Sequence, residues 1–492
     1  MQRITIKVLL GCSALMLAGQ SCTNLDETTY DVIPTSGTFG TTAAQQAALI
    51  GPLYSGLGDY YGNLTNLNTT TDEQIVPTRG GDWKDGDNWV RLYTHTWDPV
   101  TDNNQFNGPW NWCYNNITSI NQQLGTIKDA GVIAELKTLR AFFHYEAMDL
   151  FGNAIIADQV SAGTPKQSTR ADMFAFVEKE LLAAYPNLSS TVGGAYYGRM
   201  NKYVADMILA KMYLNAQVYT GTPRWADAIT RCNNIISSGK YQIVGDFFSN
   251  FVTQNQNSAE IILATPFDKS KRTGFQVQMQ NLHYLNQLTY NLGTAPWNGF
   301  AAVTEFYNSF DDKDIRKKMW LVGQQYKADG TPLMDDAIPL AFTPEIPSLV
   351  LAAGAPGRVA GARSVKYQIQ TNNTFTSQDN DFVVYRLADV YLMRAEANLR
   401  LGNTATALTD VNLIRKRAGM ADFTTLTLTD MLAERGREMA WEYHRRQDQI
   451  RFGTYGDAKR FKAKDADSHW TLYPIPRDQL ALNPNLKQNP GY

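Results

Sequence analysis

The sequence predicts a mainly α-helical protein: a scaffold of helical hairpins with a loop-rich lobe inserted into it. In residues 42–237 and 381–455, apolar residues recur at steps of three and four, the spacing that places them on one helix face. Residues 240–380 differ, because they contain clusters of Gly, Pro, Asn and Thr and short runs typical of β-strands. We therefore expect one domain over residues 41–492, with the scaffold at 41–239 and 381–492 and the lobe at 240–380.

The first 21 residues are expected to be a signal peptide of the lipoprotein type. Arg3 and Lys7 begin a segment whose apolar part, residues 8–18, is too short to span a bilayer as a helix. Small residues then precede Cys22, as in a bacterial lipobox, so Cys22 is expected to become the N-terminus and to carry a lipid. The alternative is an ordinary secretory signal in which Cys22 is incidental.

Residues 22–40 are rich in Thr, Asp and Gly and are expected to form a tether. The chain has 45 Lys and Arg against 47 Asp and Glu, and this balance lacks the basic surface that nucleic-acid binding requires. Besides Cys22, the predicted mature chain keeps Cys113 and Cys232, too few for a disulfide framework. We expect both to be buried as small apolar side chains, with a single disulfide as the alternative.

Helical segments are expected in pairs along the scaffold. Their apolar faces contain Leu136, Leu139, Phe143, Ala147 and Leu150; Phe174, Val177, Leu181 and Leu182; residues 205–219 and 225–237; Leu387, Tyr391, Ala395 and Leu399; Ala405, Leu408, Val411, Ile414 and Ala418; and Met431, Leu432, Met439 and Trp441. Gly152 and Gly402 are expected to end helices, Ser168 or Thr169 to cap one, and Thr429 to cap the last. Small residues at the helix crossings make these pairs similar to tetratricopeptide-type hairpins.

The segment around Trp83 is a candidate sugar-binding loop. Trp83 and Trp89 lie in a Gly- and Asp-rich stretch, with Asp72 and Arg79 nearby in the sequence. A sugar ring presents a flat apolar face edged with hydroxyl groups, so a glycan site combines aromatic side chains with carboxylates, amides and Arg. The alternative is a loop that buried tryptophans hold in place.

Aromatic residues in the lobe are further candidates, because long loops on a rigid scaffold often carry binding function. Tyr290, Trp297 and Trp320 lie among Asn, Gln, Gly and Pro residues and are expected to contact the ligand. The other three tryptophans between residues 83 and 112 lie in or near apolar packing patterns and are expected in the core: Trp97, Trp110 and Trp112.

Charged residues on the predicted helix at 386–397 are expected to form a solvated face or a set of intramolecular ion pairs, with no ligand role. These residues are Arg386, Asp389, Arg394 and Glu396, with Arg437 and Glu438 as partners.

Catalysis, a metal and a cofactor have little support in the sequence. None of the five His residues has metal-type spacing, and no nucleophile elbow has a suitable context. Residues 311–314 are acidic but lack the spacing of a calcium loop, so we expect a solvated loop there. A glycosidase carboxylate pair stays open, because such a pair is defined by its separation in space.

The order of the motifs resembles the SusD/RagB-type nutrient-binding outer-membrane lipoproteins of Bacteroidetes. The matching segments cover nearly the whole chain and are residues 21–27, 71–74, 77–83, 95–97, 139–152, 198–199, 385–397, 412–419, 434–438, 445–448, 451–453, 472–476 and 488–492. The run at 385–397 is the most specific of them, and the resemblance there implies that its charged residues form a buried structural network. The resemblance implies four tetratricopeptide-type helix pairs with a variable lobe, and it gives Asp72 and Arg79 as motif positions near the family's ligand site.

The same resemblance implies a function. A family member is a non-catalytic lid that captures a nutrient outside the cell, is held to the outer membrane by its lipid, and delivers the nutrient to a SusC-like TonB-dependent transporter. The expected ligand is an oligosaccharide or polysaccharide. The alternatives are a peptide or other nutrient bound in the same way, a surface glycoside hydrolase, and a purely structural or adhesive protein.

Overall fold

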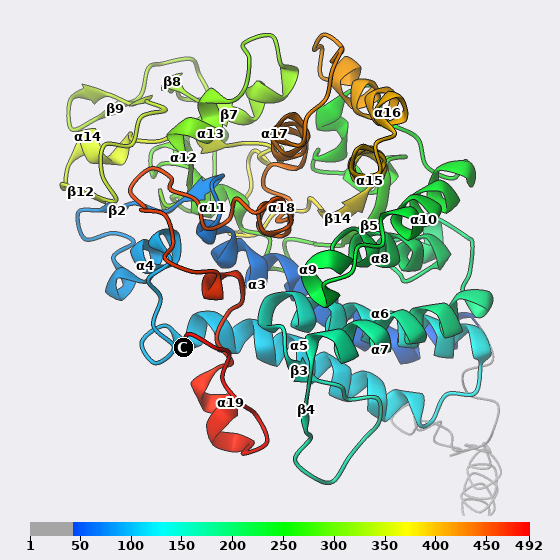
Figure 1. Ribbon diagram of the computed structural model, residues 1–492. Helices are drawn as coiled ribbons and strands as arrows, with labels where there is room; N and C mark the ends of the chain where they lie inside the picture. Colours follow the sequence, from blue (N-terminus) through cyan, green and yellow to red (C-terminus); the bar gives the residue numbers. More distant parts are fainter. Residues whose placement is uncertain (1–42) are drawn as a thin grey trace, which may run out of the picture. The chain divides into compact units, whose positions relative to one another are not determined.

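The computed structural model describes residues 43–492 (Figure 1). It divides into two units, residues 1–49 and 50–492. Of the first unit, only residues 43–49 are described, and they begin helix α2 (Ala43–Ser55). The predicted signal peptide, the tether and Cys22 therefore lie outside the described residues.

Most of residues 50–492 outside the lobe is helical. The other helices are α3 (Tyr60–Leu67), α4 (Asn88–Thr94), α5 (Asn103–Leu124), α6 (Ala130–Phe151), α7 (Arg170–Ala184), α8 (Lys202–Leu214), α9 (Ala216–Thr220), α10 (Trp225–Ser237), α11 (Val277–Asn281), α12 (Asn286–Tyr290), α13 (Thr304–Asn308), α14 (Ala355–Arg358), α15 (Leu387–Arg400), α16 (Thr404–Arg417), α17 (Leu428–Met439), α18 (Arg445–Phe452) and α19 (Arg477–Leu482).

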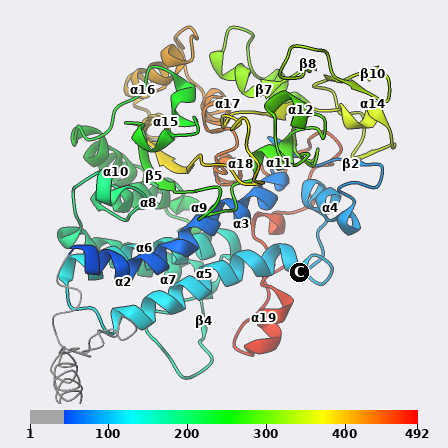
Figure 2. The same cartoon turned by 180° about the vertical axis from the view of Figure 1, so that it is seen from behind.

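Neighbouring helices pack as hairpins. Helix α5 packs on α6, α6 on α7, α8 on α10, and α15 on α16, while α10 also packs on α15 and so joins the two halves of the scaffold (Figures 1 and 2). Small side chains allow the close approach of α15 and α16, because Ala388, Ala395 and Ala407 are fully buried at their contact. The prediction of a mainly α-helical hairpin scaffold is therefore confirmed.

The helix ends test the predicted caps. Gly152 follows α6 with a positive φ of 70°, and Thr169 caps α7 with a reciprocal bond to Asp172, as predicted. The cap at Thr429 was wrong, since Thr427 caps α17. Its hydroxyl accepts the amide of Asp430, and the Asp430 carboxylate accepts from Thr427 in return, so the acid three residues downstream selects the earlier threonine.

Two predicted helices are shorter than the apolar pattern suggested. The stretch 205–219 is divided at Asn215, whose backbone leaves the helical region between α8 and α9. Trp441 lies beyond the end of α17 with φ of 59°, a left-handed conformation that cannot continue a helix.

The strands are short and mostly tie remote segments together. They are β1 (Gln74–Ile75), β2 (Thr78–Arg79), β3 (Ala154–Ile155), β4 (Gln167–Ser168), β5 (Ile261–Thr265), β6 (Ala301–Ala302), β7 (Trp320–Leu321), β8 (Gly323–Gln324), β9 (Met334–Asp335), β10 (Ile338–Pro339), β11 (Ala341–Phe342), β12 (Val350–Leu351), β13 (Arg363–Ser364) and β14 (Phe382–Arg386). Pairs β1–β6 and β2–β12 attach the N-terminal segment to the lobe, and β5–β14 closes the lobe at its base.

Most residues that the apolar pattern placed in the core are buried, but Leu182 is 40% exposed and Ala405 is exposed as well. Trp97, Trp110 and Trp112 are buried, which confirms their assignment. Cys113 and Cys232 are buried and free, so the disulfide alternative is wrong.

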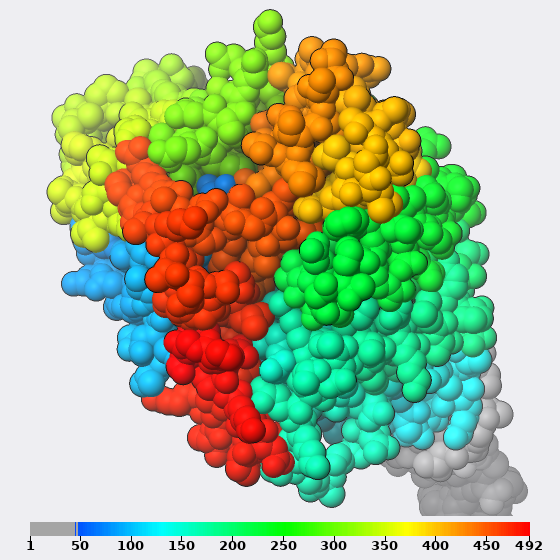
Figure 3. All heavy atoms as spheres, viewed as in Figure 1, coloured from blue at the N-terminus to red at the C-terminus, as the bar shows by residue number. Residues whose placement is uncertain are grey.

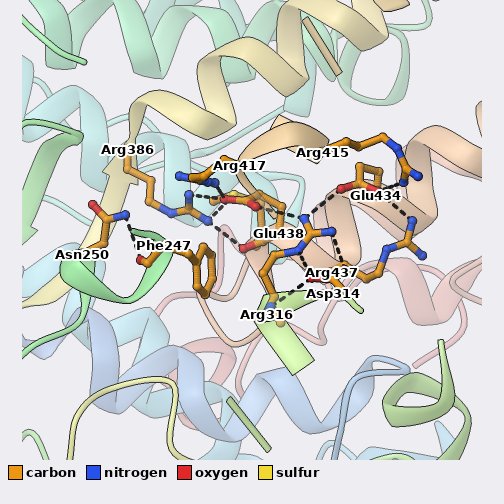
Figure 4. A network of polar contacts seen from close by, with 12 residues as sticks. Phe247, Asn250, Asp314, Arg316, Arg386, Arg415, Arg417, Glu434, Arg437 and Glu438 are labelled. Atoms are coloured by element: carbon orange, nitrogen blue, oxygen red, sulfur yellow. Dashed lines mark hydrogen bonds and ion pairs between the residues drawn. The ribbon is translucent and has the colours of Figure 1, made fainter. Parts of the chain in front are cut away.

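Buried charges join the lobe to the scaffold (Figure 4). Glu438 on α17 forms ion pairs with Arg386, Arg417 and Arg316, and Arg316 belongs to the lobe. Glu260, Asp314, Glu434 and Glu442 extend this network. The prediction of a buried structural network around Arg386 and Glu438 is confirmed.

The acidic run at 311–314 is only partly solvated. Asp312 is exposed, but Asp314 is buried against Arg316 at 2.7 Å and belongs to the charge network. The prediction of a solvated loop is therefore wrong for Asp314. Its pairing partner is two residues away, so the arginine compensates the carboxylate that the fold buries.

The C-terminal part of the chain lies between the lobe and the helices. In Figure 3 the residues coloured orange to red run across this face, between the yellow-green lobe and the green and cyan helices. The blue segment that contains α4 lies against the lower edge of the lobe (Figures 1 and 3).

Candidate functional site

A tight turn fixes the predicted sugar-binding loop against the lobe. The backbone amides of Arg79 and Asp82 each donate to the other's carbonyl, at 2.9 and 3.2 Å. Gly80 adopts a positive φ of 68°, and its amide donates to the Leu351 carbonyl of β12 at 3.0 Å. The loop therefore leaves β2 directly beside the lobe strand β12 (Figure 1).

Trp83 joins this loop to the lobe. Its ring centroid lies 5.5 Å from that of Trp89 and 5.4 Å from that of Phe300, and its ring covers Gly299, where a Cβ atom would collide with it. The Trp83 Nε1–H donates to the Trp297 carbonyl at 2.6 Å. Trp83 is half-buried and Trp297 is 36% exposed, so two partly exposed tryptophans from remote segments meet here. We call this pair the Trp platform.

Carboxylates and a hydroxyl lie beside the Trp platform. The Tyr284 hydroxyl donates to the exposed Asp82 carboxylate. Burial and Asp82 raise the pKa of Tyr284 to about 12, so this hydroxyl stays protonated at neutral pH. Trp89 is buried, and its Nε1–H donates to Asp85 at 2.7 Å. The arrangement offers aromatic surface together with carboxylate oxygens that accept hydrogen bonds from hydroxyl groups.

The backbone around the Trp platform adopts unfavourable conformations. Trp83, Asp85, Asp87 and Asn298 have φ values of 57°, 38°, 64° and 54°. Such left-handed conformations at residues other than glycine cost about 1–3 kcal/mol each and gather at ligand clamps and active sites. Their concentration here supports the assignment of this region as the functional site.

Arg79 supports the site from below, with its guanidinium facing away from solvent. Its side chain donates to the carbonyls of Asn298, Gly357 and Ala360, at 3.0, 2.6 and 2.9 Å. The residue is only 3% exposed, and burial lowers the pKa of its guanidinium to about 9. Because backbone carbonyls use its donors, Arg79 is arranged to hold the lobe.

Asp72 is paired with Arg445. Arg445 donates from Nε and Nη2 to the two Asp72 oxygens, at 2.6 and 2.7 Å. Burial alone would raise the pKa of Asp72, but Arg445 outweighs it and lowers that pKa. The carboxylate therefore connects the 71–74 segment to α18.

Two lobe aromatics lie apart from the contacts that join Trp83 and Trp297. Trp320 is 5% exposed and packs against Phe306, Phe310 and Trp441, with centroids 5.8–6.3 Å away. Tyr290 ends α12, and burial raises its pKa to about 12. The structure thus brings together Trp83, Trp89 and Trp297 from the predicted set, and these are the residues on which a binding proposal can rest.

Sequence reasoning missed three residues that build the Trp platform: Tyr284, Asn298 and Gly299. The Asn298–Gly299 dipeptide after Trp297 carries a turn signal, because both residue types tolerate the left-handed conformation. Nothing in the local sequence distinguishes Tyr284 from the other tyrosines of the lobe.

A small cavity of about 30 Å³ lies among α3, α6, α8 and α18. Glu146, Asp149, Lys211 and His444 line it. Burial, together with Asp149, raises the pKa of Glu146 to about 8. Within residues 43–492, no group of three or more His, Cys, Asp or Glu side chains is arranged to hold a metal ion. None of the helices in that range is long and apolar enough to cross a bilayer.

Two family models match the chain. The model described as "SusD family" matches residues 357–492, and the model described as "Starch-binding associating with outer membrane" matches residues 25–214. Together these segments cover most of the helical scaffold, except α9 and α10.

Known proteins resemble the chain over most of its length. The starch-binding protein SusD of Bacteroides thetaiotaomicron is 25% identical over 465 residues, covering 83% of this chain and 82% of that protein. A SusD-like protein of Bacteroides fragilis superposes with a TM-score of 0.74 at 20% identity, covering 93% of this chain and 98% of the other. A surface glycan-binding protein A of B. thetaiotaomicron, solved with laminarihexaose, gives 0.73 at 20% identity, covering 91% and 99%.

These structures share the helical fold, and the two family models and the SusD relative match the segments that build it. The chain belongs to the SusD family.

Proposed function

We propose that this protein binds an oligosaccharide or polysaccharide on the cell surface without cleaving it. The observation that carries the proposal is the Trp platform, where Trp83 and the exposed Trp297 lie beside the Asp82 carboxylate and the Tyr284 hydroxyl. Aromatic faces stack on the apolar face of a sugar ring, and carboxylates accept its hydroxyl protons. Similar proteins described as starch-binding or as glycan-binding support the proposal.

Only some of the residues predicted to bind the ligand form the proposed contact surface. Trp83 and Trp297 contact the sugar, and Trp89 supports Trp83 from beneath. Asp72 and Arg79 are left out of the contact surface because Arg445 and backbone carbonyls bind their polar groups. Trp320 is left out because it is buried, and Tyr290 because it ends α12, apart from the contacts that join Trp83 and Trp297.

Delivery to a transporter completes the proposed function. The glycan passes to a SusC-like TonB-dependent barrel in the outer membrane, and a lipid on Cys22 holds the protein at the outer face of that membrane. The family description that mentions association with the outer membrane supports this location. The proposal includes no cofactor and no catalytic residue.

A binding screen with matched variants tests the proposal. The soluble protein, without residues 1–22, is titrated calorimetrically with maltoheptaose, laminarihexaose and a peptide library. Trp297→Ala and Trp83→Ala should weaken the binding of the preferred glycan at least about tenfold, which is about 1.4 kcal/mol.

Trp225→Ala is the matched control, since Trp225 is a half-buried tryptophan at the start of α10 in the helical scaffold. Its affinity should equal that of the wild type. Binding of peptides alone would favour the alternative nutrient, and a shortened glycan after long incubation would favour the hydrolase.

A further inference from the structure

Asn298 lies between Trp297, whose carbonyl accepts from Trp83, and Gly299, which the Trp83 ring covers. Each polar atom of Asn298 makes a hydrogen bond. Its amide donates to the Leu282 carbonyl at 2.9 Å, and its own carbonyl accepts from Arg79. In the side chain, Oδ1 accepts from Arg363 at 2.8 Å and Nδ2 donates to the Arg358 carbonyl at 3.1 Å. The residue is fully buried in a left-handed conformation, so these four bonds hold a strained turn.

Two arginines, Arg79 and Arg363, hold this turn by hydrogen bonds, and neither is paired with a carboxylate. Arg363 is fully buried and donates to the carbonyls of Ala360, Gly361 and Arg358, besides Asn298. Among the described residues, neither Arg79 nor Arg363 has a carboxylate within ion-pair distance. Burial lowers the pKa of both guanidinium groups, and the positive charge of Arg79 lowers the pKa of Arg363 further. Besides Asn298, their acceptors are the backbone carbonyls of Gly357 and Arg358 in the last turn of α14 and of Ala360 and Gly361 just after it.

Burying two guanidinium groups without carboxylates is unfavourable, so an ordinary turn would not be built this way. The contacts that this turn makes with Trp83 explain the two buried arginines. Trp297 precedes Asn298, and its carbonyl receives the Trp83 indole; Gly299 follows, and its bare Cα receives the Trp83 ring. Displacing Asn298 therefore displaces both contacts that position Trp83.

We infer that Asn298, Arg79 and Arg363 form a positioning hub that sets the affinity of the Trp platform for its ligand without touching the ligand. This inference rests on the proposed function for its affinity readout, and it changes the expected role of Arg79 from a ligand contact to a support. A preformed platform binds more tightly because the ligand does not have to order it.

Two variants separate the side-chain bonds from other effects. Asn298→Gly keeps the left-handed backbone accessible and removes only the Oδ1 and Nδ2 bonds. Arg79→Lys keeps the positive charge, but its single ammonium group cannot reach all three carbonyls that Arg79 binds. It tests the inference independently if Asn298→Gly does not fold. Asn255→Gly is the matched control, because Asn255 is equally buried and makes three side-chain bonds near β14, with Asn250 and Asp381.

The measurement is fluorine NMR of the protein labelled with 5-fluorotryptophan, with the Trp83 and Trp297 signals assigned from Trp83→Phe and Trp297→Phe. Asn298→Gly and Arg79→Lys should broaden or shift these two signals and leave the core tryptophans unchanged. Both should weaken binding of laminarihexaose, or of whichever glycan the screen selects, about tenfold. Asn255→Gly should lower thermal stability only.

Unchanged Trp83 and Trp297 signals in a folded hub variant, with unchanged affinity, would overturn the inference and leave the three residues a role in stability alone. If the wild type binds no oligosaccharide, the proposed function fails by itself. The fluorine spectra then decide the hub, because they need no ligand.

Discussion

Replacing Glu438 by Gln should destabilise the protein by about 3 kcal/mol, toward the lower end of the range of about 3–5 kcal/mol for breaking a buried ion pair. Glu438 is fully buried and pairs with Arg386, Arg417 and Arg316 (Figure 4). Burial would raise its pKa, but these three guanidinium groups outweigh burial and hold it well below the usual range.

We expect a loss of stability at the lower end of this range because each of the three arginines keeps another carboxylate partner. Arg386 retains Glu260 and Glu442, Arg316 retains Asp314 and Glu434, and Arg417 retains Glu260. No guanidinium is therefore left without a carboxylate. Gln also keeps one acceptor oxygen and nearly the same volume, so the loss is electrostatic.

Urea denaturation followed by circular dichroism measures the change in unfolding free energy. Glu305→Gln is the control, because Glu305 is an exposed partner of Arg460 at 3.2 Å, and such surface pairs contribute about 0–1 kcal/mol. If Glu438→Gln unfolds at the same urea concentration as Glu305→Gln, the network does not hold the lobe on the scaffold.

Three further outcomes are expected. Between the ordinary glutamate pKa of 4.5 and the folded-state pKa of about 8, folded Glu146 holds a proton that the unfolded chain has lost, so this group's contribution to stability falls as pH rises through that window. Glu146→Gln removes the dependence, so its stability relative to wild type should rise by about 1.4 kcal/mol per pH unit from pH 5 to 8; a constant difference would contradict this. Trp320→Ala should lose about 3–5 kcal/mol of stability with unchanged glycan affinity in the folded protein, and a loss of affinity at unchanged stability would place Trp320 in the site. Cys22→Ala should release the protein from membranes, and retention in the outer-membrane fraction of cells without the transporter would rule out lipid attachment there.

The helices were predictable because their signals are local. Apolar residues at steps of three and four, Gly152 after α6 and Thr169 before α7 all lie within one or two helical turns of what they determine. The error at Thr429 arose where two threonines compete, and Asp430 decides between them. Trp441 was placed in a helix because its spacing fits, although its backbone turns left-handed.

The candidate site was only partly predictable because its contacts are remote in the sequence. Trp320 has polar neighbours in the chain, but Phe306 and Trp441 bury it in space. The Arg79 side chain donates to backbone carbonyls more than 200 residues away. Every residue has a backbone carbonyl, so the sequence does not show which ones an arginine will bind. Trp83 and Trp297 were predicted because tryptophan among Gly, Asn and Asp or Pro residues is itself a chemical signal, and the structure brings the two together.

The position of a bound oligosaccharide tests the central claim most directly. A crystal structure of the protein with the glycan selected by the screen should show a sugar ring stacked on Trp297 or Trp83. A hydroxyl of that glycan should lie within hydrogen-bond distance of Asp82, and the Arg79 guanidinium should still bind the three carbonyls. A glycan bound elsewhere, with the Trp297 ring uncovered, would contradict the account.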